Sequence, residues 1–154
     1  MQTNDAAIEM LNDLIKINND RIAGYEKAIG EAKDQEADLR PLFEEMINES
    51  RRYKQELIAK ASELGDENID DDTTTAGNIY RAWMSLKASF NDDPGTVLDS
   101  CEFGEDAWRR AYESALGAED IDPDIRELVQ SQYDTEEASH RLIKQKRDEY
   151  NAKA

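Results

Sequence analysis

Apolar residues recur every three or four positions over four long stretches of the chain, which is the spacing of amphipathic α-helices. The stretches cover about residues 5–33, residues 39–64, about residues 95–117 and about residues 123–150. A turn sequence follows each of the first three, and Gly65 ends the second predicted helix. The four apolar stripes consist of Ile8, Leu11, Ile15, Ile22, Tyr25, Ile29 and Ala32; Leu39, Phe43, Met46, Tyr53, Leu57 and Leu64; Leu98, Cys101, Trp108, Tyr112 and Ala115; and Ile125, Val129, Ile143 and Tyr150.

The segment between the second and third long helices contains a shorter predicted helix. The run DENIDDDTTTAG is acidic, polar and glycine-containing, which predicts a loop, and Thr73–Thr75 offer helix caps. The following NIYRAWMSLKASF predicts the short helix, and Pro94 in NDDPG lies near the start of the third long helix. The apolar stripe of the short helix consists of Ile79, Trp83, Leu86 and Phe90.

The first pair of long helices resembles the second pair in sequence. GYEKAIG at 24–30 matches AYESALG at 111–117 with an offset of 87, and DLRPL at 38–42 matches DIREL at 124–128 with an offset of 86. Two matches at nearly the same offset indicate a duplicated helical hairpin. The connection between the two hairpins is too long for a tight turn and long enough to cross the length of a bundle.

The predicted fold is therefore all-α: a ferritin-like four-helix bundle of two pseudo-repeated hairpins, with a short extra helix in the crossover. We expect a single domain over residues 1–154, with one hairpin at 5–65, the crossover at 66–94 and the second hairpin at 95–152. An approximate two-fold axis should relate the two hairpins.

Each apolar stripe is interrupted by a polar residue near its middle. The interruptions are Asn18, Ser50 and Glu105 in the first three helices, and Gln132 and Glu136 in the fourth. Under the repeat, Asn18 matches Glu105, and Ser50 matches Glu136. At a rise of about 1.5 Å per residue, these matched positions lie within roughly two turns of the bundle midpoint. We therefore predict that they point inward and form one polar layer across the core.

The composition is strongly acidic, with a formal net charge of −17 at pH 7 and a pI of about 4.4. Such a surface repels nucleic-acid phosphates and anionic lipid headgroups, so neither nucleic acid nor a membrane is an expected partner. No signal peptide or membrane-spanning stretch is recognisable, and the expected location is the cytoplasm. The single cysteine, Cys101, argues against an intrachain disulfide or a cysteine zinc cluster and predicts a small buried side chain.

Four pieces of the chain, in order, resemble a family of uncharacterised bacterial proteins: LNDLIKINNDRIAGYEKA, NIYRAWMSLKASF, LDSCEFGEDAWRRAYESAL and ASHRLIKQKRD. The resemblance extends over nearly the whole chain. Members of that family are ferritin-like four-helix bundles of similar length, assigned to a domain of unknown function. The resemblance implies the bundle fold and a distant kinship with ferritins and rubrerythrins, and it implies no established activity.

The fourth long helix contains an E-x-x-H sequence, formed by Glu137 and His140, and His140 is the only histidine of the chain. In two-metal ferritin-like bundles, two helices each contribute such a motif and the other two each contribute a glutamate. The second hairpin retains much of this chemistry. Its candidate metal ligands are Glu105, Glu136, Glu137 and His140.

The first hairpin lacks the matching ligands. Asn18 stands where the first helix would supply a carboxylate, and Arg52 stands where the second would supply a histidine. A cation at that place repels a metal ion and pairs with carboxylates instead. We therefore expect no two-metal centre and no cofactor, and the metal alternative is a single divalent ion, zinc, iron or manganese, near His140.

Two functions are compatible with these residues. The first is a non-enzymatic bundle that acts in protein interaction or stress tolerance, with a degenerate metal site. In such a non-enzymatic bundle, Glu105 and Glu136 pair with Arg21, Arg52 or Arg109 and fix the register of the helices. The alternative is a metal-binding or redox protein that uses the candidate ligands of the second hairpin, because buried carboxylates are costly unless something neutralises them.

A homodimer is a further expectation from the sequence. The predicted short helix around Trp83 carries more apolar side chains than one crossover helix needs to anchor itself, with Tyr80 beside its stripe. An exposed apolar face of this kind is typical of an association surface. The alternative is that the whole stripe packs on the bundle of the same chain.

Overall fold

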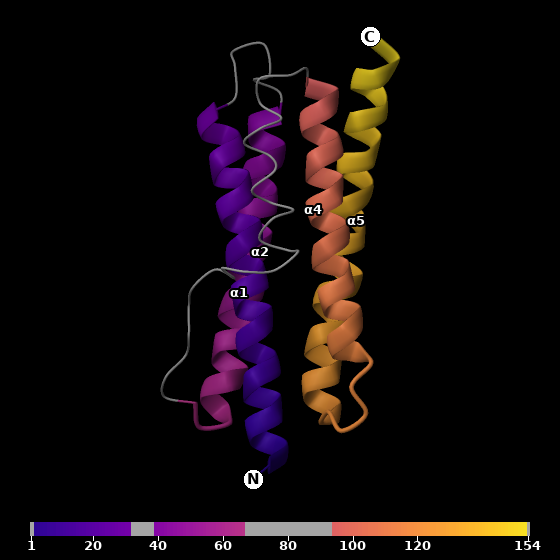
Figure 1. The fold of residues 1–154 in the computed structure, drawn as a ribbon. Coiled ribbons are helices and arrows are strands. Elements are labelled where there is room, and N and C mark those ends of the chain that lie inside the picture. Colours follow the sequence, from indigo (N-terminus) through magenta and orange to yellow (C-terminus); the bar gives the residue numbers. More distant parts are fainter. Residues whose placement is uncertain (1, 32–38, 67–93, 154) are drawn as a thin grey trace.

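The computed structural model describes residues 2–31, 39–66 and 94–153, which form a bundle of parallel and antiparallel helices (Figure 1). α-Helices make up nearly all of these residues, and no strand occurs among them. The helices are α1 Gln2–Glu31, α2 Leu39–Glu63, α4 Pro94–Leu116 and α5 Pro123–Lys153. The all-α four-helix bundle predicted from the apolar periodicity is confirmed. None of the helices within the described ranges combines the length and the apolar composition that crossing a bilayer requires.

The four helices form two hairpins that lie side by side. α1 and α2 run antiparallel and pack closely together, as do α4 and α5 (Figure 1). α2 ends at one end of the bundle and α4 begins at the other (Figure 1). The predicted short helix around Trp83 and the caps at Thr73–Thr75 lie outside the described residues.

Local sequence signals account for the helix ends. After α2, Gly65 adopts a φ of 97°, a left-handed conformation that glycine adopts without a steric penalty. Its amide donates to the Ser62 carbonyl at 3.0 Å, and the Asp66 amide donates to the Ala61 carbonyl at 3.1 Å, which closes the last turn. Pro123 is the first residue of α5, where the missing amide hydrogen costs no intrahelical hydrogen bond.

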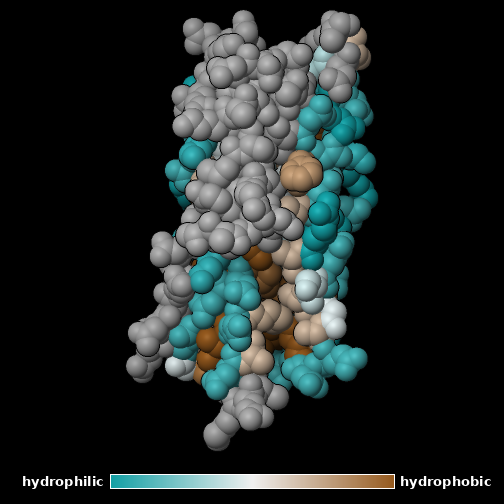
Figure 2. All heavy atoms as spheres, in the orientation of Figure 1, coloured by the Kyte–Doolittle hydropathy of each residue, from teal (hydrophilic) through white to brown (hydrophobic). Residues whose placement is uncertain are grey.

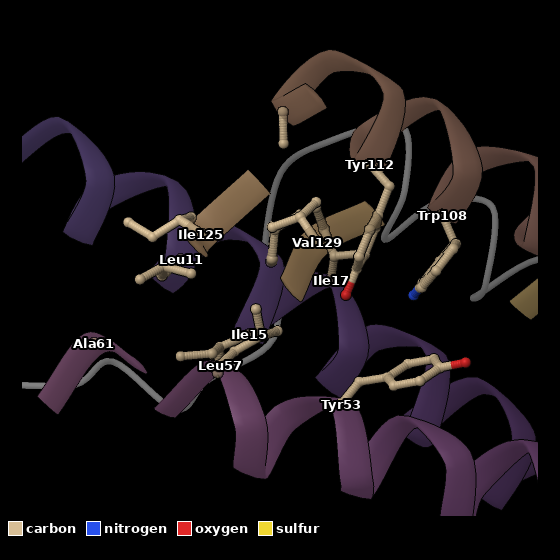
Figure 3. Close-up of a cluster of buried hydrophobic side chains, with 12 residues drawn as sticks. Leu11, Ile15, Ile17, Tyr53, Leu57, Ala61, Trp108, Tyr112, Ile125 and Val129 are labelled. Carbon is tan, nitrogen blue, oxygen red and sulfur yellow. The ribbon is translucent and has the colours of Figure 1, made fainter. Parts of the chain in front are cut away.

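Two apolar clusters fill the bundle, one toward each end, and all four helices contribute to both. The first cluster consists of Ile22, Tyr25, Ala28, Leu39, Phe43, Met46, Ile47, Leu98, Cys101 and Ile143. The second, shown in Figure 3, consists of Leu11, Leu14, Ile15, Ile17, Tyr53, Leu57, Ala61, Trp108, Tyr112, Ala115, Ile125 and Val129. Cys101 is fully buried, as predicted from its place on the stripe.

Burial follows the sequence repeat. Many buried positions of α1 have a buried counterpart 87 positions later in α4, and many buried positions of α2 have one 86 positions later in α5. The pairs include Leu11 with Leu98, Leu14 with Cys101, Asn18 with Glu105, Tyr25 with Tyr112, Leu39 with Ile125, Phe43 with Val129, Ser50 with Glu136, and Leu57 with Ile143. The duplicated sequence pattern therefore corresponds to a duplicated pattern of burial, while superposition about a two-fold axis stays a prediction.

Candidate functional site

A layer of polar side chains crosses the bundle between the two apolar clusters. Asn18, Ser50, Glu105 and Glu136 are each 0% exposed, so the prediction that these four point into the core is confirmed. The other buried polar residues of the described chain are Asn19, Asp20, Arg21, Glu49, Gln132 and Ser139. Because these residues come from α1, α2, α4 and α5, the polar layer connects all four helices near their middles.

Arg21 of α1 is the central cation of the polar layer. Its Nε and Nη2 atoms donate to Oε1 of Glu105 on α4 at 3.1 and 2.9 Å. Its Nη1 donates to Oγ of Ser50 at 3.0 Å and lies 3.0 Å from Oε1 of Glu49 on α2. Burial disfavours the charged guanidinium, but Glu105 and Glu49 hold the pKa of Arg21 above its ordinary value. One guanidinium therefore connects three helices and neutralises buried carboxylates.

Asn18 of α1 organises the uncharged part of the polar layer, and all four of its hydrogen-bonding positions are used. Its Nδ2 donates to the Leu14 carbonyl at 2.9 Å and to the Tyr112 hydroxyl at 2.8 Å. Its Oδ1 accepts from Oγ of Ser50 at 2.9 Å and from Nε1 of Trp108 at 3.1 Å. Ser50 lies on α2, and Tyr112 and Trp108 lie on α4. Asn18 therefore fixes the register of α1 against both helices, as a core asparagine does in coiled coils.

α5 joins the polar layer through Gln132 and Ser139. Oε1 of Gln132 accepts from the Tyr112 hydroxyl at 2.6 Å, and its Nε2 donates to the Tyr53 carbonyl at 3.1 Å. Oγ of Ser139 donates to Oε2 of Glu49 at 2.8 Å. Together with the contacts of Arg21 and Asn18, these bonds form a continuous network around the bundle axis.

Replacing Asn18 by leucine should lower the free energy of unfolding by about 2–4 kcal/mol, because buried donors on Trp108 and Ser50 lose their acceptor. Chemical denaturation measures the loss. Asn12→Leu in the same helix is the matched control, since Asn12 is half-buried and donates to Asp66 near the bundle end. We expect about 1 kcal/mol or less for the control, and equal losses for the two variants would contradict the role of Asn18.

Glu105 and Glu136 form a buried carboxyl pair where α4 meets α5. The Oε2 atom of each is buried without a hydrogen-bond partner in the structure, and each side chain shifts the pKa of the other. Burial, and then the charge of Glu105, raises the pKa of Glu136 to about 10. Burial also opposes the ionisation of Glu105, but Arg21, Glu136 and the hydrogen bond from Tyr25 lower the pKa of Glu105. At neutral pH the pair therefore carries one negative charge, on Glu105, and one proton, on Glu136.

Arg109 and His140 lie on the outer side of the carboxyl pair. Nη1 of Arg109 donates to Oε1 of Glu136 at 2.5 Å, and the guanidinium lies 4.0 Å from the centre of the Tyr133 ring. Nδ1 of His140 is 3.8 Å from Oε2 of Glu136, and its Nε2 is 3.4 Å from Oδ1 of Asp106. The His140 side chain is 14% exposed, so it stands between the polar layer and solvent.

The structure brings three of the four predicted metal ligands together, and the fourth faces away. Glu136 adjoins both Glu105 and His140. Glu137 is exposed and accepts from Nη2 of Arg141 at 2.7 Å. The reason is helix geometry, because consecutive residues of α5 are rotated by about 100° about its axis.

The predicted pairing of the core carboxylates with arginine is confirmed for two of the three candidate arginines. Glu105 pairs with Arg21, and Glu136 pairs with Arg109. Arg52 is exposed on α2, so it does not take the place in the core that its position in E-S-R-R suggested.

The part of Arg21 as the centre of the layer was missed, although the repeat contained the signal. Arg21 lies 87 positions before Trp108, a residue on the predicted apolar stripe of the third long helix, and both are fully buried. The burial of Glu49 was not predicted either, and the repeat contains no signal for it. The matching position is Thr135, which is exposed.

The polar layer does not fit a two-metal centre. Oε1 of Glu105 already accepts from Arg21 and Tyr25, and Oε1 of Glu136 accepts from Arg109. The Oε2 atoms of this carboxyl pair have no hydrogen-bond partner in the structure and are the ones available to share a proton. Within residues 2–31, 39–66 and 94–153, no group of three or more histidine, cysteine, aspartate or glutamate side chains is placed to hold a metal ion.

The fold and the polar layer define this protein as an all-α four-helix bundle with an arginine–carboxylate network in its core. The chain belongs to the family described as Domain of unknown function (DUF2383), which matches residues 6–119. The match includes nearly all of α1 and the whole of α2 and α4, and α5 lies beyond it. The predicted resemblance to a domain of unknown function is confirmed. No match to the chain was found among curated proteins or among solved structures.

Proposed function

We propose that this protein is a non-enzymatic, ferritin-like bundle that acts through protein interaction, with an arginine in the place of metal ions. The observation that carries the proposal is the fully buried guanidinium of Arg21 between Glu105 and Glu49. In a two-metal bundle, metal cations neutralise the carboxylates of the core. A guanidinium supplies the same charge but has neither redox chemistry nor a coordination position for oxygen.

The charges of the polar layer balance without a metal. Arg21 and Arg109 supply two positive charges. Glu49, Glu105 and Glu136 supply three carboxyl groups, and Glu136 keeps its proton because burial and the charge of Glu105 raise its pKa to about 10. Two carboxylates then face two guanidinium groups, so these five side chains balance one another without an additional cation.

Kinship with ferritins is part of the proposal. It is supported by the matched burial of the two hairpins and by the positions of the end of α2 and the start of α4 at opposite ends of the bundle. It is also supported by the mid-core carboxyl groups of Glu105 and Glu136, at repeat positions where the first hairpin has Asn18 and Ser50. In this interpretation, the first hairpin has lost its metal ligands and Arg21 has replaced their function.

A second candidate function is the binding of a single divalent ion, zinc, iron or manganese. The observation in its favour is that Oε2 of Glu105, Oε2 of Glu136 and Nδ1 of His140 are buried and have no hydrogen-bond partner in the structure. An ion at this place would displace the proton of the carboxyl pair. Two oxygens and one imidazole nitrogen are a reasonable donor set for these metals, but the three side chains would have to move to hold an ion, since they are not placed to do so in this structure.

Metal analysis of protein purified without chelator separates the two candidates. We expect less than about 0.1 metal ion per chain, because the guanidinium groups of Arg21 and Arg109 already balance the charges of the layer's glutamates. His140→Ala should leave this background unchanged and alter only stability. One zinc, iron or manganese per chain that disappears in His140→Ala would establish the second candidate. Two irons per chain that oxygen oxidises would contradict both.

The remaining expectations from the sequence stay predictions. A homodimer through the Trp83 segment concerns residues outside the described part of the chain. A cytoplasmic location and a role in stress tolerance are compatible with the acidic, metal-independent bundle proposed here, and neither is needed for the interaction described below.

A further inference from the structure

An apolar groove of about 560 Å³ lies between the first half of α1 and the end of α4. Leu14 and Ile17 are the most buried of its lining residues, and Met10, Ala111 and Ala115 lie along it. Figure 2 shows apolar atoms exposed between the lower parts of these two helices. The volume falls within the range of roughly 300–1,000 Å³ that is typical of binding pockets.

Acidic side chains line the groove on both sides. Glu9 and Asp13 belong to α1, and Glu119 and Asp120 follow the end of α4. All four are exposed. Burial, and then the charge of Glu9, raises the pKa of Asp13, while Lys16 lowers it. Carboxylates that repel one another beside an apolar surface are stabilised by an approaching cation.

The charge of the groove decides among the possible occupants. A second copy of the chain carries a net charge of −17 and the same acidic groove, so electrostatic repulsion disfavours it. Nucleic acid and anionic lipid are disfavoured for the same reason. A helix with an apolar stripe flanked by lysine or arginine satisfies both the apolar floor and the acidic sides, which is the usual way an amphipathic helix binds a groove.

We propose that the groove between α1 and α4 binds a basic amphipathic helix of another protein. The apolar side chains of the partner enter the groove, and its basic side chains approach Glu9 and Asp13 on one side and Glu119 and Asp120 on the other. This inference rests on the proposed interaction function and specifies the chemistry of the partner.

The test uses a fluorescently labelled peptide of leucine and lysine, about 18 residues or five helical turns long, with leucines on one face. Fluorescence anisotropy compares the wild-type chain with Glu9→Lys/Asp13→Lys and with Glu44→Lys/Glu45→Lys. The second variant has the same change in charge on an exposed part of α2 away from the groove. We expect the groove variant to weaken binding about tenfold or more, and the control variant to weaken it about threefold or less.

A steric variant tests the apolar part of the inference. Ala111→Trp places a large side chain in the groove without changing the charge, and it should reduce peptide affinity about tenfold. Circular dichroism confirms that each variant is folded. A peptide with glutamate in place of lysine should not bind.

Several results would overturn the inference. These are no binding to the wild-type chain, equal weakening by the two charge variants, or unchanged affinity in Ala111→Trp. A wild-type dimer that Ala111→Trp dissociates would show that a second copy occupies the groove instead. Metal analysis is independent of all these measurements, so a metal-loaded protein that still binds the peptide would contradict the proposed function and leave the groove assignment intact.

Discussion

Replacing Arg21 by methionine should lower the free energy of unfolding by about 3–5 kcal/mol at neutral pH. Methionine fills a similar volume but leaves Glu105 in the core without the cation that neutralises it. Glu49 loses the same partner, although it keeps the hydrogen bond from Ser139. Urea denaturation, followed by circular dichroism, gives the free energy of unfolding for both proteins.

Two variants identify the cause of this loss. Arg109→Met removes a partly exposed guanidinium from Glu136, which can remain protonated. This variant should therefore lower the free energy of unfolding by only about 1 kcal/mol. Adding Glu105→Gln to Arg21→Met removes the unpaired carboxylate and should restore about 1–2 kcal/mol or more. A loss below about 1 kcal/mol for Arg21→Met, with no recovery in the double variant, would show that the guanidinium does not neutralise the core.

The sequence predicted the bundle because each long helix of a soluble bundle has to present an apolar stripe to its neighbours. Interruptions of such a stripe are informative for the same reason. A polar side chain at a core position is costly unless it has partners, so Asn18, Ser50, Glu105 and Glu136 were expected to meet one another. The structure places all four in one buried layer.

Periodicity could not predict which charges the layer contains or how they pair. Arg21 matches the stripe residue Trp108 in the repeat, but it was predicted only as one of three arginines that could reach the carboxylates. Glu49 and Ser139 lie beside the stripes, and their contact depends on how α2 and α5 face each other, which spacing within one helix does not reveal. The E-x-x-H pattern did not reveal that the Glu137 side chain faces solvent. Glu136, one residue earlier, occupies the core position instead.

Glutamine at position 136 should be tolerated near pH 6 and become the more stable variant at alkaline pH. Burial, and then Glu105, raises the pKa of Glu136 to about 10 in the folded chain, against an ordinary value of 4.5. Between these values the folded state binds one more proton than the unfolded state, so stability falls as pH rises, by up to about 1.4 kcal/mol per pH unit. Glutamine has no such proton to lose, and it can still donate to Glu105.

The comparison is made by urea denaturation of wild type, Glu136→Gln and Glu105→Gln from about pH 6 to about pH 9. From about pH 6 to about pH 9, the free energy of unfolding of Glu136→Gln should rise by about 2–4 kcal/mol relative to that of the wild type. The reason is that only the wild type loses the stabilising effect of the bound proton. General repulsion among the 36 acidic residues affects all three proteins nearly equally and cancels in the difference.

Glu105→Gln should behave in the opposite way. The pKa of Glu105 is lowered in the folded chain, so its charge stabilises the fold above its ordinary pKa, and that contribution is lost only in acid. Removing the charge should therefore cost about 3 kcal/mol at neutral pH, since Arg21 loses its main partner. Parallel pH curves for wild type and Glu136→Gln, or equal costs for the two glutamine variants at neutral pH, would contradict a core in which Glu105 holds the charge and Glu136 holds the proton.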